Sequence, residues 1–206
     1  MSFFDQEAKR RLTDAVREAE RQTSGEIVIA VRPASDRYRH VDLGVGLVTA
    51  IAVLCVFLYH PAPFDFTYLP LELAAAFAVG VVASLGIPPL KRALLSRAAV
   101  TRAVRRAARE AFVDRGVHRT RGRTGVLVCI SVFERRVELV PDVGIDPVSF
   151  HAEWSAAREA LEEAVRRRDV KALASAVVTL GRALSQPLPR AADDTNELAD
   201  APEEVA

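Results

Sequence analysis

Three acidic side chains in this 206-residue chain are the strongest candidates for chemistry. Glu26 begins a β-branched apolar segment, and Asp142 and Asp146 follow another such segment. Carboxylates that meet at one edge of a sheet can bind a divalent cation such as Ca²⁺ or Mg²⁺, or exchange protons as a general acid and base. Asp142 is equally typical of a turn before Val-Gly, and Asp146-Pro147 of a helix N-cap. The spacing favours these structural roles and leaves Glu26, Asp142 and Asp146 as candidate catalytic residues, with the two aspartates as candidate metal ligands.

Other catalytic classes have less support in the sequence. His118 and His151 lack the spacing of a metal site, and no serine or cysteine lies in the context of a nucleophile elbow. Gly44-x-Gly46 belongs to an apolar segment rather than to a phosphate-binding loop. Cys55 and Cys129 lie in segments that we expect to stay apart, which excludes a disulfide framework and fits a reducing, cytoplasmic environment.

The elements that position the candidate residues include two apolar segments in the middle of the chain, Val41 to Tyr59 and Leu73 to Leu90. A helix rises about 1.5 Å per residue, so roughly 20 residues cross a hydrocarbon core of about 30 Å. His60-Pro61 ends the first segment, and Glu72 stands just before the second. We therefore predict a transmembrane hairpin over residues 41–90.

Positive charge flanks this predicted hairpin at both ends, whereas its connecting loop has no lysine or arginine. Cytoplasmic flanks of membrane helices are enriched in Lys and Arg. The pattern predicts a multi-pass protein of a bacterial inner (plasma) membrane with both termini in the cytoplasm. The flanking basic residues are Arg32, Arg37, Arg39, Lys91, Arg92 and Arg97.

A basic stretch follows the hairpin, because residues 91–123 contain eleven Lys or Arg and only two acidic residues. Such clusters next to a membrane helix are attracted to anionic lipid head groups. A solvated helix face is an equally good interpretation, and nucleic-acid binding is disfavoured because interleaved aromatic residues are missing. The candidate lipid-contacting residues are Lys91, Arg92, Arg97, Arg102, Arg105, Arg106 and Arg109.

The soluble parts on either side of the hairpin are predicted to form one small α/β domain, with a sheet flanked by amphipathic helices. Because neither part makes a complete domain, residues 26–31 should pair in the same sheet as residues 126–132. The predicted divisions are the first part of the domain over 1–40, the hairpin over 41–90, the second part over 91–186 and an acidic, disordered tail over 187–206. The predicted elements are helices 4–22, 96–115, 147–168 and 170–185 and strands 26–31, 124–132 and 136–140.

Two short motifs resemble the TPM domain family. Thr23-Ser24-Gly25-Glu26-Ile27-Val28 and Arg123-Thr124-Gly125-Val126-Leu127-Val128 match its Gly-Glu-Ile and Thr-x-x-Gly-Val-Leu strands, and the hairpin of strands that leads to Pro141-Asp142-Val143-Gly144 matches its glycine-containing loop. The resemblance covers the soluble residues from about 5 to 185. It implies a compact α/β domain attached to a membrane, and some relatives are associated with phosphatase activity, metal binding or photosystem repair. This chain differs from exported members in carrying its hairpin directly after the first strand.

The sequence therefore predicts an anchored interaction or accessory module at the cytoplasmic face of the inner membrane. Its expected partners are the lipid bilayer, anionic head groups and a membrane or cytoplasmic protein. The alternative is a metal-assisted phosphatase that uses Glu26, Asp142 and Asp146. The phosphatase hypothesis requires these carboxylates to converge within about 5 to 6 Å of a common point in an open cleft.

Overall fold

A computed structural model describes residues 4–60, 66–191 and 196–204 of the chain. The chain divides into two compact units, one formed by residues 1–35 together with 101–206 and the other by residues 36–100. We call them the soluble unit and the hairpin unit and describe each by itself.

The sheet of the soluble unit joins segments from both sides of the hairpin. Its strands are β1 (Glu26–Arg32), β2 (Gly125–Ser131), β3 (Arg136–Pro141) and the two-residue β4 (Glu203–Glu204), in the order β3-β2-β1-β4. β1 and β2 run parallel over seven residue pairs from Glu26 opposite Gly125 to Arg32 opposite Ser131, and β3 is antiparallel to β2. The predicted pairing of the first strand with the second across the hairpin is confirmed.

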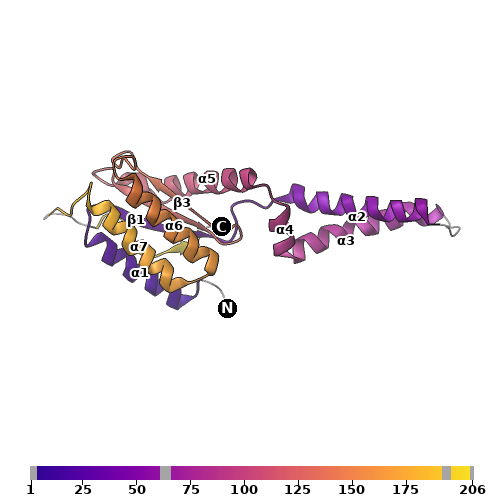
Figure 1. Ribbon diagram of the computed structural model, residues 1–206, viewed down its shortest axis with the longest axis horizontal. Helices are drawn as coiled ribbons and strands as arrows, with labels where there is room; N and C mark the ends of the chain where they lie inside the picture. Colours follow the sequence, from indigo (N-terminus) through magenta and orange to yellow (C-terminus); the bar gives the residue numbers. More distant parts are fainter. Residues whose placement is uncertain (1–3, 61–65, 192–195, 205–206) are drawn as a thin grey trace. The chain divides into compact units, whose positions relative to one another are not determined.

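Helices cover both faces of this sheet, and alternation along β1 decides which residues they contact (Figure 1). Ile27, Ile29 and Val31 belong to the larger core, together with side chains of α1 (Gln6–Glu20), α6 (His151–Arg167) and α7 (Val170–Ser185). Val28 and Ala30 face the other way and pack with alanines of α5 (Arg97–Asp114). The predicted fold class, a small sheet flanked by amphipathic helices, is confirmed.

One helix begins later than the sequence predicts. The pattern predicts a helix from residue 147, whereas α6 begins at His151 and residues 147–150 form turns. The Asp146 carboxylate accepts a hydrogen bond from the Val148 N–H at 3.0 Å, and the Asp146 carbonyl accepts one from the Ser149 hydroxyl at 2.7 Å. These local hydrogen bonds stabilise a turn in place of the first helical residues.

The hairpin unit contains two helices that are long and apolar enough to cross a membrane. They are α2 (Arg39–Tyr59), with a mean hydropathy of 2.5, and α3 (Leu69–Gly86), with 1.8. Most of their apolar side chains are exposed, which supports membrane association rather than a soluble core. A short 3₁₀ turn, η1 (Phe66–Tyr68), precedes α3, and the helix α4 (Pro88–Leu94) follows it. The predicted second span, residues 73–90, is therefore displaced, because the backbone before Pro88-Pro89 leaves the helical conformation at Ile87.

The two long helices meet through glycine. A Cβ atom added to Gly80 would lie 2.9 Å from the Cα of Gly46, so these two positions allow the backbones to approach closely. Nearer the charged end, the buried Asp42 accepts a hydrogen bond from the Ser84 hydroxyl at 2.7 Å and pairs with the Lys91 ammonium at 2.8 Å. The hairpin thus combines small-residue packing with a compensated buried charge.

The described residues of the acidic tail contact both cores of the soluble unit. Leu188 packs against the larger core, and the Thr23 hydroxyl donates to its carbonyl at 2.7 Å. Further along, Leu198 packs against the smaller core, and β4 pairs with β1. These contacts come from residues far away in the sequence, which is why the composition of the tail alone does not predict them.

Candidate functional site

Asp142 closes the turn that follows β3. Its side chain is buried, and one carboxylate oxygen accepts a hydrogen bond from the Val143 N–H at 2.8 Å while the other lies 3.0 Å from Nε of Arg123. Its own N–H donates to the Gly125 carbonyl at 2.8 Å. The carboxylate is therefore occupied by local structure, as its position before Val-Gly suggests.

The structure does not bring the three candidate carboxylates into one cleft. Glu26 and Asp142 lie on opposite sides of Gly125 in the sheet, so two strand spacings of about 4.8 Å each separate their backbones. Asp146 is exposed and belongs to the turn before α6. Within residues 4–60, 66–191 and 196–204, no group of three or more His, Cys, Asp or Glu side chains is arranged to hold a metal ion.

Glu26 instead contributes to a polar pocket of about 270 Å³. Its lining joins the end of α1, the start of β1 and the C-terminal segment, which are far apart in the sequence. The carboxylate of Glu26 accepts a hydrogen bond from the N–H of Glu197 at 3.2 Å. The lining residues are Arg17, Glu20, Arg21, Glu26, Arg190, Asn196 and Asp200.

Glu20 has the most perturbed environment in this pocket, although the sequence gives it no special signal. Burial raises its pKa from 4.5 to about 8, and the negative charges of Glu26 and Asp200 act in the same direction. The Ile27 N–H, which donates to the Glu20 carboxyl group at 2.9 Å, and Arg190 oppose this shift. Glu20 is therefore largely protonated at neutral pH and can give or take a proton close to pH 8.

The pocket is lined by both positively and negatively charged side chains. Arg17 and Asp200 form an ion pair at 2.8 Å, and the guanidinium of Arg190 donates to the Glu20 carbonyl at 3.1 Å. No serine, threonine, cysteine or histidine occurs among the described lining residues, which leaves carboxylates as the potential nucleophiles among them. The pocket presents both positive and negative groups that can recognise a charged ligand.

Comparison with known proteins identifies the fold but no family. No family model matches the chain, and no curated protein matches it. Among solved structures, the NMR structure of BA42 protein from the psychrophilic bacteria Bizionia argentinensis sp. nov. matches with a TM-score of 0.60 and 18% sequence identity, covering 99% of this chain and 97% of that one. This chain has a TPM-domain-like fold. The likeness supports the resemblance seen in the strand motifs at the level of fold.

The basic residues of this TPM-like chain fall into different environments. Arg102, Arg105, Arg106 and Arg109 are all exposed on α5, and Arg105 also lies 3.4 Å from Glu138 of β3. Lys91 has a different role, because its ammonium lies between the Asp42 carboxylate and the Arg37 carbonyl, each at 2.8 Å. It balances a buried acid within the hairpin unit and is the least suited of the predicted basic residues to bind a lipid head group.

Proposed function

We propose that this protein is a membrane-anchored interaction or accessory module, with its TPM-like unit at the cytoplasmic face of a bacterial inner membrane. The observation that carries this proposal is the insertion of two membrane-capable helices between β1 and β2, which pair directly in one sheet. The soluble unit is thus continuous with the hairpin through two segments and has to fold on one side of the bilayer. The distribution of Lys and Arg around the hairpin favours the cytoplasmic side.

The proposed role is binding rather than catalysis, since the candidate carboxylates serve separate structural purposes. Asp142 is paired with Arg123, and Asp146 caps a turn. The exposed arginines of α5 provide a surface for anionic head groups, each contributing about 1 kcal/mol when close to the membrane.

The topology is tested by labelling single cysteines with a membrane-impermeant maleimide, in a Cys55→Ser background. Burial raises the pKa of the Cys129 thiol to about 11, so this residue stays largely unreactive. Tyr68→Cys, in the loop before α3, should react in intact spheroplasts, and Lys171→Cys, in α7, only after permeabilisation. Labelling of Lys171→Cys in intact spheroplasts would overturn the proposed orientation.

The non-catalytic role is tested with the full chain in lipid nanodiscs, supplied with a phosphomonoester and Ca²⁺, Mg²⁺ or Mn²⁺. We expect no phosphate release above that of empty nanodiscs. Release that falls in Glu26→Gln but persists in Glu7→Gln, a change on the exposed face of α1, would replace the binding role with a phosphatase.

Lipid contact is tested by amide hydrogen exchange of the full chain in nanodiscs. Anionic nanodiscs should slow exchange along α5 relative to neutral ones, and replacement of Arg102, Arg106 and Arg109 by glutamine should abolish the difference. The matched control replaces three exposed arginines of α6 in the same way, and equal effects of the two triple variants would argue against a specific lipid-facing surface. These control residues are Arg158, Arg166 and Arg167.

A further inference from the structure

The outer edge of β1 is covered by the end of the chain. We call residues 196–204 the C-terminal strap. The strap runs parallel to β1, from Glu197, whose N–H donates to the Glu26 side chain, to Glu204, which is paired with Val31. All residues of β1 except Arg32 are buried. Because an open edge strand offers unpaired backbone groups to other chains, the strap protects a surface that is able to bind an extended peptide.

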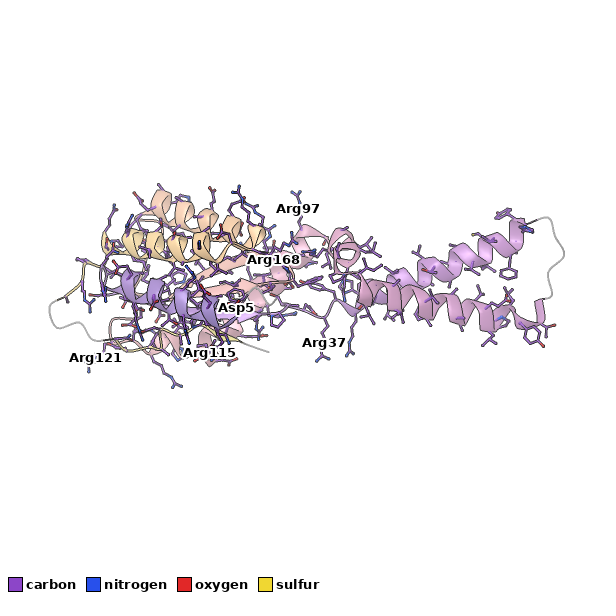
Figure 2. The ribbon with its side chains drawn as sticks, turned by 90° about the horizontal axis from the view of Figure 1, so that it is seen from below. Asp5, Arg37, Arg97, Arg115, Arg121 and Arg168 are labelled. Carbon is purple, nitrogen blue, oxygen red and sulfur yellow. The ribbon has the colours of Figure 1, made fainter. Side chains whose placement is uncertain are left out.

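Three acidic residues, at every third position of the strap, contact hydrogen-bond donors or positive charges of the soluble unit. Glu197 accepts a hydrogen bond from the backbone N–H of Arg121 at 2.8 Å, and Asp200 pairs with Arg17 of α1 at 2.8 Å. Glu203 pairs with Arg115, which follows α5. In Figure 2, Arg115 and Arg121 are both labelled along the lower margin of the soluble unit. The strap is thus received by one backbone N–H and two arginine side chains, which come from α1 and from the segment between α5 and β2.

Apolar contact adds a further element of recognition. Leu198, directly after the first acidic residue, packs against the smaller core. Among the described residues, Ala30 and Val31 of β1 pair with β4, and this part of the backbone ladder is short. Exposed ion pairs contribute little individually, and a short ladder adds little more. The strap is therefore held by several modest contacts and is suited to exchange with a competing segment.

We propose that the β1 edge is a docking groove for an extended acidic peptide and that the strap is its resident occupant in cis. The proposed ligand carries acidic side chains at every third position and an apolar residue directly after the first. It binds parallel to β1, as in strand addition, with its acids on the groups that contact the strap. This inference rests on the proposed function, for which it names the binding surface and the chemistry of the partner.

The test uses two proteins in nanodiscs, the full chain and a chain ending at Ala191, with a fluorescein-labelled peptide of residues 195–206 as the probe. Fluorescence anisotropy should show at least ten-fold tighter binding to the shortened chain, because the tethered strap competes at a high effective concentration. A peptide with Glu197→Gln, Asp200→Asn and Glu203→Gln should bind at least ten-fold more weakly to the shortened chain, as should a peptide with lysine at these positions.

The receiving surface is tested in the shortened chain. Arg17→Gln should weaken the peptide at least three-fold, whereas Arg11→Gln, a matched change on the exposed side of α1, should leave the affinity unchanged. A folded shortened chain that binds none of the peptides, or binds the lysine peptide as well as the acidic one, overturns the proposal. Such a failure is distinguishable from failure of the proposed function, because the maleimide and phosphate-release experiments do not depend on the groove.

A second variant keeps the test valid if the shortened chain does not fold. The full chain with Glu197→Gln, Asp200→Asn and Glu203→Gln keeps its strap but weakens its ion pairs, so the unmodified peptide should displace it. Peptide binding at least five-fold tighter than to the unmodified full chain supports the groove. Equal or absent binding in this folded variant refutes it.

Discussion

The Glu20→Gln substitution is expected to stabilise the soluble unit at alkaline pH and to leave its stability unchanged in acid. Burial beside Glu26 and Asp200 raises the pKa of Glu20 from 4.5 to about 8. Below pH 4.5 this carboxyl group is protonated in both the folded and the unfolded chain, so it contributes no pH dependence. As the pH rises from 4.5 to about 8, the unfolded chain releases the proton first, and the free energy of unfolding falls. Above about 8 the loss is complete.

The size of the effect follows from the difference between the pKa values of Glu20 in the unfolded and the folded chain. A difference between 4.5 and about 8 corresponds to about 4.8 kcal/mol at 1.36 kcal/mol per pH unit. Because Glu20 is only half-buried, water screens the charge, and we take about half of that value, ~2 kcal/mol, as the expected gain for Glu20→Gln at pH 9. Glutamine keeps an oxygen that can accept the hydrogen bond from the Ile27 N–H, so the two proteins should agree within about 0.5 kcal/mol at pH 4.5.

The assay is urea unfolding of the full chain in detergent between pH 4.5 and 9, followed by tryptophan fluorescence. Trp154 is the single tryptophan of the chain and lies in the larger core, so its emission reports the soluble unit. Glu18→Gln removes an acidic group from the exposed side of the same helix and serves as the control, with a change below about 1 kcal/mol. A difference between Glu20→Gln and the unmodified protein that stays constant with pH, or that grows toward acid, would refute the reasoning.

Three further experiments test the packing of the two units. Gly181→Ala should destabilise the soluble unit by about 1–2 kcal/mol in urea unfolding, because the added Cβ at position 181 would lie 2.7 Å from the Cα of Ala19. This overpacking outweighs a gain of about 1 kcal/mol in helix propensity. A variant that is more stable than the unmodified protein would contradict the close contact. Asp142→Ala should cost about 2–3 kcal/mol and Asp142→Asn roughly half as much, because asparagine retains the hydrogen bond in the turn; equal losses would show that this hydrogen bond contributes nothing. Asp42→Ala should lower the thermal unfolding temperature of the full chain in detergent, and Lys91→Ala added to it should recover part of the loss, because a buried charge without its partner costs about 3–5 kcal/mol; additive losses would argue against a coupled pair.

Much of the fold is predictable because its signals are local. The apolar runs of β1 and β2 and the helical periodicity of α1 and α7 require no knowledge of distant residues. The pairing of β1 with β2 follows from the incompleteness of each soluble part. The sequence contains a signal for the helix end at Ile87, the pair Pro88-Pro89. The continuous apolar run through these residues is the stronger signal, and it predicts a span that extends too far.

The candidate site is less predictable because its environment is assembled from distant segments. Glu20 occupies the last turn of α1, where an acid is typical of a solvated face, and its burial results from β1 and the strap. β4 has two residues within an acidic, alanine-rich segment and therefore carries no periodic signal. Asp142 was correctly interpretable as a turn residue, since its hydrogen bond to the Val143 N–H depends on its immediate neighbour.

The pairing of β1 with β2 has a consequence for the order in which the protein is synthesised. From Arg32 to Gly125 the ribosome adds 125 − 32 = 93 residues, which takes roughly 5–20 s at about 5–20 residues per second. During that interval the membrane-capable helices α2 and α3 are made while β1 has no strand to pair with. Newborn chains are therefore most vulnerable to strand exchange before β2 emerges, and the edge of β1 remains unprotected until the strap is made. Closure of the sheet thus waits for the described segment that is synthesised last.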